Sequence, residues 1–176
     1  MPYHSILFPV DFTSLDPVSV RSIRSLLTDN DAKLHIFHVL NSFEEVPMGF
    51  PIPPVYYREV DLAAGKELEK QADHFRDFGK RISLGLYRGR PDQVILEISQ
   101  SKNADLILLL SHGKGLFGRI LVGSTSTSVI HHSPIPVLLI KPEKVNSVFR
   151  RQLQETKPPE NFYDILAVSE KKESLP

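Results

Sequence analysis

The chain contains no cysteine. Disulfide bonds, zinc sites with cysteine ligands, iron–sulfur clusters and thiol catalysis are therefore all excluded. It also lacks an excess of charge of either sign, because 21 lysine and arginine residues balance 21 aspartate and glutamate residues. Proteins that bind nucleic acids or membrane surfaces normally carry a basic surplus, so the composition gives no electrostatic argument for either class.

Long apolar runs are also missing from the sequence. No run approaches the roughly 20 residues that span a bilayer, and the first residues carry no basic region of a signal peptide. A chain without cysteine suits a reducing compartment. We therefore expect a soluble, cytoplasmic protein. The length of 176 residues is enough for one domain with an appendage.

Short apolar runs alternate along the chain with segments of helical periodicity. The predicted strands are residues 5–10, 34–40, 82–87, 105–110 and 137–140. The predicted helices begin at Asp16-Pro17, near Tyr56 (with an apolar stripe that reaches Phe75), after Arg90-Pro91 and at Ser124. This alternation predicts an α/β fold with a five-stranded, doubly wound parallel sheet, which is a Rossmann-like three-layer sandwich.

Two segments depart from this alternation. Residues 41–55 contain four prolines and a glycine, which predicts a long surface loop. Residues from 143 onward are polar and carry one apolar patch, at residues 162–168. We predict one domain over residues 1–142 and a tail or appendage over residues 143–176, with at most one short helix.

The segment after the fourth predicted strand is rich in glycine and hydroxyl groups. In open parallel sheets, ligands bind beyond the carboxyl ends of the strands, where the strand order reverses. Residues 111–123 contain four glycines as well as Lys114 and Arg119, and the hydroxyl-bearing run Ser124–Ser128 follows. Glycines let backbone amides approach an anion, and hydroxyls at a helix start add donors. The segment predicts a phosphate-binding site.

Two familiar phosphate motifs fit this segment poorly. Gly113, Gly115 and Gly118 satisfy G-x-G-x-x-G, but they follow the fourth strand, and Leu138 stands where a dinucleotide fingerprint has an acidic residue. A P-loop would need a lysine after Gly123, and the sequence has serine there. We therefore expect neither a dinucleotide fingerprint nor a P-loop NTPase.

A third pattern fits better. The spacing of Gly113, nine further residues and Gly123-Ser124 resembles the nucleotide-binding signature of universal stress proteins. The segments at residues 6–13, 38–39, 89–91 and 133–140 also resemble that family, so the likeness runs in order from about residue 3 to 141. Leu110 stands where the signature has its first glycine, and its side chain could crowd a ribose at that strand end.

The resemblance implies an adenine nucleotide alpha-hydrolase-like fold that binds ATP or AMP, with or without magnesium. It places Asp11 beside the nucleoside, the Val39 backbone against adenine and the glycine-rich loop around ribose and phosphates. The implied cofactor-binding residues are Pro9, Val10, Asp11, Val39, Leu110, Ser111, Gly113, Gly123, Ser124 and Thr125. We predict no catalytic residues and no metal site.

Some residues have a plain structural interpretation beside the functional one. Asp11 could cap the loop after the first strand instead of contacting a nucleoside. His35 and His38 point to opposite faces of their strand, so they cannot share a metal, and hydrogen-bonded core or interface positions explain them better.

Three functions remain open on the sequence. The leading one is a non-catalytic, adenine-nucleotide-binding stress or signalling module that acts as a homodimer. The alternatives are a nucleotide-free dimeric module, which Leu110 favours, and a slow ATPase or self-phosphorylating protein with acceptors in Ser124–Ser128. The predicted dimer contact is the apolar last strand, Val137–Ile140, because nothing within it protects a sheet edge.

Overall fold

Five parallel strands form a single sheet in the order β3-β2-β1-β4-β5. This is a computed structural model, and it describes residues 2–40, 54–111 and 123–141. The strands are β1 Ser5–Pro9, β2 Lys33–Leu40, β3 Ile82–Arg88, β4 Leu106–Leu110 and β5 Val137–Ile140. The predicted parallel, doubly wound sheet is confirmed.

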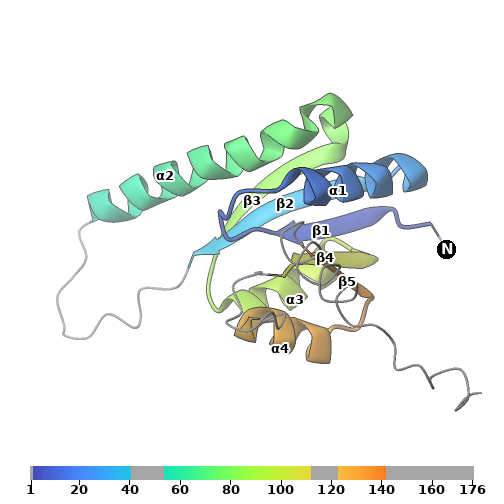
Figure 1. Cartoon of the computed structure of the whole chain (residues 1–176). Helices are drawn as coiled ribbons and strands as arrows, with labels where there is room; N and C mark the ends of the chain where they lie inside the picture. Colours follow the sequence, from blue (N-terminus) through green and yellow to red (C-terminus); the bar gives the residue numbers. More distant parts are fainter. Residues whose placement is uncertain (1, 41–53, 112–122, 142–176) are drawn as a thin grey trace, which may run out of the picture.

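Helices cover both faces of the sheet. They are α1 Pro17–Asn30, α2 Pro54–Ala72, α3 Pro91–Ser101 and α4 Ser124–His132, and the 3₁₀ segment η2, Asp73–Arg81, follows α2. Helices α1 and α2 lie on one side of the sheet and α3 and α4 on the other, which gives the three predicted layers (Figure 1). In the described residues, no helix is both long and apolar enough to cross a membrane.

The strand bounds agree with the predicted ones to within one residue, whereas two other boundaries differ more. The predicted loop over residues 41–55 extends too far, because α2 already begins at Pro54, a residue that suits the first helical position. Residues 41–53 of that loop lie outside the described residues, as does the predicted tail from residue 143. Phe75 belongs to η2 and not to the stripe of α2, although its side chain is fully buried as expected.

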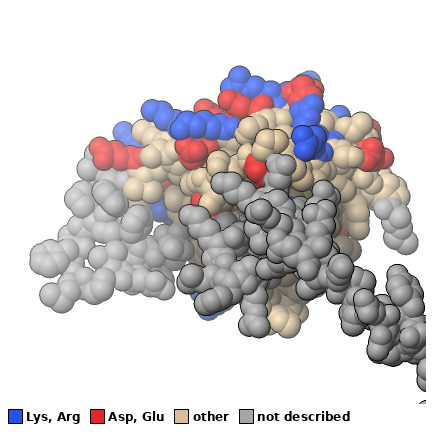
Figure 2. Space-filling view, viewed as in Figure 1, with Lys and Arg blue, Asp and Glu red and all other residues tan. Residues whose placement is uncertain are grey.

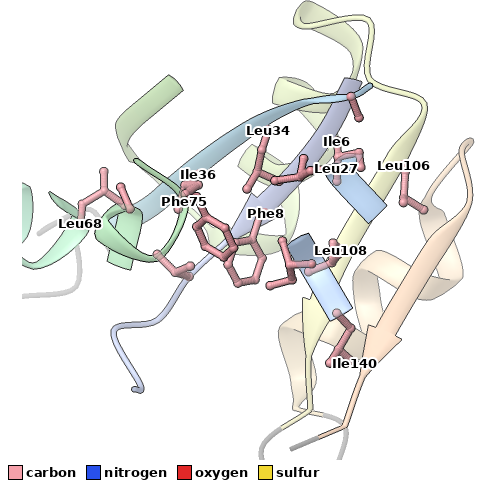
Figure 3. Packing of buried hydrophobic residues seen from close by; sticks show 14 residues of the cluster. Ile6, Phe8, Leu27, Leu34, Ile36, Leu68, Phe75, Leu106, Leu108 and Ile140 are labelled. Atoms are coloured by element: carbon pink, nitrogen blue, oxygen red, sulfur yellow. The ribbon is translucent and has the colours of Figure 1, made fainter. Parts of the chain in front are cut away.

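The α1–α2 side of the sheet holds the larger apolar cluster, here called the α1–α2 core. Figure 3 shows it, with Phe8 of β1 and Phe75 of η2 at its centre. A second cluster, the α3–α4 core, includes Leu7 of β1 and Ile107 of β4. Because β1 and β4 are buried on both faces, their sequences are continuous apolar runs and do not alternate.

Local signals set the start of α1 as the sequence predicts. Asp16 is the N-cap, and its side chain accepts hydrogen bonds from the backbone N–H groups of Val18 and Ser19 at 3.0 and 3.1 Å. Such a cap satisfies donors that have no partner within the helix.

The surface over α1 and α2 carries basic and acidic side chains intermingled (Figure 2), in keeping with the balanced net charge.

Candidate functional site

A cavity of about 490 Å³ opens at the carboxyl ends of β1, β2 and β4. Its volume falls within the range of about 300–1,000 Å³ that small-molecule sites occupy. Strand β1 lies between β2 and β4, so the cavity sits where the strand order reverses, as expected for a ligand site in this architecture. The lining residues are Pro9, Val10, Asp11, His38, Val39, Leu40, Pro91, Ile95, Leu109, Leu110, Gly123, Ser124, Thr125 and Ser126.

The amino end of α4 forms the polar wall of this cavity. Gly123 is its N-cap and provides no side-chain cap, and the first turn closes with Thr127 N–H donating to the Gly123 carbonyl at 2.9 Å. The N–H groups of Ser124, Thr125 and Ser126 therefore have no partner within the helix. The side-chain hydroxyls of the same three residues make no hydrogen bond to the described residues. Such a helix end attracts an anion.

A second helix end borders the same cavity. Helix α3 starts at Pro91, which lines the cavity together with Ile95 one turn later. Asp92 of α3 accepts a hydrogen bond at 2.8 Å from the hydroxyl of Ser128 on α4, and this bond lowers the pKa of the Asp92 carboxyl. The contact ties together the two helices that form this side of the site.

Asp11 follows β1 and lines the cavity. One of its carboxylate oxygens accepts hydrogen bonds from both the backbone N–H and the hydroxyl of Thr13, at 3.2 and 2.7 Å. This is the loop-capping role that aspartate often has after a strand. The capping role is thus confirmed, and it places the carboxylate of Asp11 at the wall of the cavity.

The two strand histidines occupy hydrogen-bonded positions, as predicted. His35 is 7% exposed, and its two ring nitrogens lie 2.8 Å from the Ser83 hydroxyl and 2.9 Å from the Tyr87 hydroxyl. His38 Nδ1 lies 2.6 Å from the carbonyl oxygen of Val10. Across the described ranges, no group of three or more potential ligand side chains could hold a metal ion.

Eight of the ten cofactor-binding residues implied by the sequence line this cavity: Pro9, Val10, Asp11, Val39, Leu110, Gly123, Ser124 and Thr125. Ser111 does not line it; this residue follows β4, is 2% exposed, and its hydroxyl has no hydrogen-bond partner among the residues that the structure describes. Gly113 lies outside the described residues, as do Lys114 and Arg119.

Six further residues line the cavity without having been assigned to it: His38, Leu40, Pro91, Ile95, Leu109 and Ser126. The sequence predicts the start of a helix at Pro91, and Ile95 lies on the buried face of that helix. Helical periodicity identifies the buried face of α3, but it does not reveal that the first turns of this helix end at a ligand site. Ser126 had a usable signal, because it lies within the same hydroxyl-rich run as Ser124 and Thr125.

Comparison with known proteins settles the family. The sequence profile of the Universal stress protein family matches residues 2–141. The chain belongs to the universal stress protein family. It is 27% identical over 146 residues to a universal stress protein of Methanocaldococcus jannaschii, an alignment that covers 81% of this chain and 84% of that protein.

Solved structures of universal stress proteins share the fold. One, a universal stress protein in complex with cAMP, superposes with a TM-score of 0.59 at 18% identity, over 80% of this chain and 98% of that one. Another, from Archaeoglobus fulgidus in complex with dAMP, has a TM-score of 0.56 at 20% identity, over 80% of this chain and all of that one. At these identities the comparison establishes the fold.

Proposed function

We propose that this universal stress protein binds an adenine nucleotide, ATP or AMP, in the cavity and serves as a non-catalytic stress-response or signalling module. One observation carries the proposal. Eight of the nucleotide-binding residues that the resemblance to universal stress proteins implies, from segments far apart in the chain, line one cavity at the point where the strand order reverses. Two universal stress proteins of the same fold were crystallised with adenine nucleotides, which supports this ligand class.

The chemistry of the wall suits the two ends of such a ligand. Val39, Ile95 and Leu109 offer apolar surface for a base. The amides and hydroxyls at the start of α4 offer donors for phosphate oxygens, and the helix dipole favours negative charge there. The carboxylate of Asp11 offers an acceptor for the hydroxyl or amino groups of a nucleoside.

Titration calorimetry with ATP and with AMP, with and without magnesium, tests the proposal. A double variant, Ser124→Ala with Thr125→Val, removes two hydroxyls from the α4 end. Because a hydrogen bond to a charged group contributes about 1.5–3 kcal/mol, we expect the double variant to bind at least about tenfold more weakly. Ser101→Ala, which removes an exposed hydroxyl at the other end of α3, is the matched control and should bind like the wild type. Absence of binding by the wild-type protein at millimolar nucleotide refutes the proposal.

We further propose that the site has no strong catalytic activity. Two residues that line the cavity, Asp11 and His38, are suited to acid–base chemistry. Each already makes a hydrogen bond to the backbone: Asp11 accepts from the Thr13 N–H, and His38 Nδ1 contacts the Val10 carbonyl oxygen. The alternative is slow ATP hydrolysis or self-phosphorylation within Ser124–Ser128. Phosphate release and the intact mass after incubation with ATP separate the two, since only the alternative produces free phosphate or a phosphorylated chain.

A homodimer through β5 is the third part of the proposal. Strand β5 lies at an edge of the sheet, and its Leu138 is 39% exposed. Pro136 and Pro142 bracket the strand in the sequence, which limits pairing to a short closed contact. Antiparallel pairing of two β5 strands would give two-fold symmetry, the commonest in oligomers.

Light scattering behind a sizing column tests the dimer. Leu138→Glu places a charge in the proposed contact and should give a monomer. Leu84→Glu is the matched control, because Leu84 is 41% exposed on β3 at the opposite edge of the sheet, and this variant should remain dimeric. A monomeric wild-type protein at tens of micromolar contradicts the dimer.

A further inference from the structure

The turn after β1 contains a residue in an unusual backbone conformation. Phe12 has φ 64°, in the left-handed region that aromatic residues rarely adopt. Within the described ranges, two other residues that are not glycine have positive φ, Asp31 and Asn103. Those two lie just after α1 and α3, where a left-handed residue is an ordinary way to end a helix. Phe12 has no such role, so neighbouring contacts must hold it.

One set of these contacts comes from β2. The ring of Phe12 stacks on the ring of His38, with 3.9 Å between the ring centroids and 29° between the planes. His38 Nδ1 lies 2.6 Å from the Val10 carbonyl oxygen, on the other side of Asp11 in the chain. Because a carbonyl oxygen can only accept, Nδ1 carries the proton and donates it. His38 thus contacts the chain both before and after Asp11.

A second set comes from α2 and from the turn itself. The amide of Gln71, a residue only 5% exposed, donates to the Thr13 carbonyl at 3.1 Å. The Asp11 carboxylate accepts from the N–H and hydroxyl of Thr13. Phe12 packs against the α1–α2 core, whereas Asp11 lines the cavity. The left-handed Phe12 therefore lies between its own half-buried ring, which packs on the core, and the Asp11 carboxylate at the cavity wall.

We propose that Phe12 and His38 are a positioning pair that holds the turn at residues 10–13 in the form needed to bind the nucleotide. The inference rests on the proposed function. A wall that is already ordered loses less conformational freedom when a ligand binds, so pre-organisation raises affinity without any new contact. His38 itself lines the cavity, whereas Phe12 does not. Phe12 therefore acts on the ligand through His38, Val10 and Asp11, and hydrogen exchange of the turn separates the positioning role of His38 from any direct contact with the nucleotide.

Three variants separate the parts of this arrangement. Phe12→Gly removes the ring and relieves the backbone strain, because glycine adopts positive φ freely. His38→Phe keeps a ring but removes the Nδ1 donor. Phe12→Tyr keeps an aromatic ring and should bind ATP and exchange its amides like the wild type. Asn103→Gly is the matched control, because it relieves the same kind of strain at φ 47°, at the far end of α3 from the cavity.

ATP affinity and amide hydrogen exchange are both measured at a temperature where circular dichroism shows every variant folded. We expect Phe12→Gly and His38→Phe to bind ATP at least fivefold more weakly than the wild type. Phe12→Tyr and Asn103→Gly should stay within twofold. Hydrogen exchange of the amides at residues 10–13, measured without nucleotide, should become at least tenfold faster in Phe12→Gly and His38→Phe and in no other variant. Ile23→Val, a conservative change in the α1–α2 core, should move neither readout.

The outcomes distinguish this inference from the proposed function. If the wild-type protein binds no adenine nucleotide, both are wrong. If the wild type binds and the Phe12→Gly and His38→Phe variants bind equally well, only the positioning role is wrong. Unchanged exchange at residues 10–13 in these variants also overturns it, since the turn would then be ordered without the pair.

Discussion

His35 makes the stability of the fold depend on pH. It is 7% exposed and hydrogen-bonded through both ring nitrogens, to Ser83 and Tyr87 of β3. Burial, with a smaller contribution from the positive charge of Lys102, lowers the pKa of His35 from 6.5 to about 4. The folded protein therefore keeps this imidazole neutral at pH values where the unfolded chain protonates it.

The size of the effect follows from the two pKa values. Above about pH 6.5 the imidazole is neutral in both states and contributes no pH dependence. As the pH falls from 6.5 toward 4, the unfolded state takes up a proton that the folded state does not, so the free energy of unfolding decreases. At about 1.4 kcal/mol per pH unit, the loss reaches about 3 kcal/mol near pH 4.

Urea unfolding at several pH values between 7.5 and 4 measures this loss. His35→Gln is the comparison, because glutamine keeps a polar amide but cannot take up a proton. Carboxyl groups that titrate over the same range contribute equally to both proteins and cancel in the difference. The wild type should lose about 3 kcal/mol more than the variant between pH 6.5 and 4. Parallel stability curves for the two proteins would show that burial of His35 does not cause this pH dependence.

Three other outcomes are expected. Leu110→Gly should tighten nucleotide binding because it removes a side chain from the cavity wall, and unchanged calorimetric affinity would argue against crowding by that side chain. The same variant should have a lower melting temperature because Leu110 also packs on the α1–α2 core. Truncation after Glu143 should leave a cooperative calorimetric melt, whereas a large loss of melting temperature would show that the tail docks on the domain. Gly85→Ala should destabilise the fold in urea, because an added Cβ would lie 2.6 Å from the Tyr87 ring and 2.8 Å from His35; wild-type stability would mean that the rings shift freely.

The elements of the fold could be predicted because their signals are local. The run at residues 106–110 is apolar throughout because β4 is buried on both faces, and a continuous apolar run predicts such burial from the sequence. Asp16-Pro17 starts α1 through contacts within four residues. The end of α2 was harder to predict. Apolar spacing continues through Phe75 whether the backbone is α-helical or 3₁₀.

The site could be predicted in outline, since the architecture itself places ligands at the strand-order reversal. The side-chain contacts between strands could not be predicted. Outside the cavity, His35 meets Ser83 because the two are register partners in the β2–β3 pair, and no sequence signal gives that register directly. The left-handed Phe12 has no local signal either, because contacts from β2 and α2, both distant in the sequence, hold the turn in which it lies.

Amide chemical shifts during an ATP titration report both whether the nucleotide binds and where on the protein it binds. If ATP occupies the cavity, the shift changes should saturate and centre on the amides of Asp11, Val39 and Gly123–Thr125, which line it. The amides of β3 far from the cavity, such as Ser83, should not change. No change at millimolar ATP, or changes confined to another surface, would show that the cavity is not an adenine-nucleotide site.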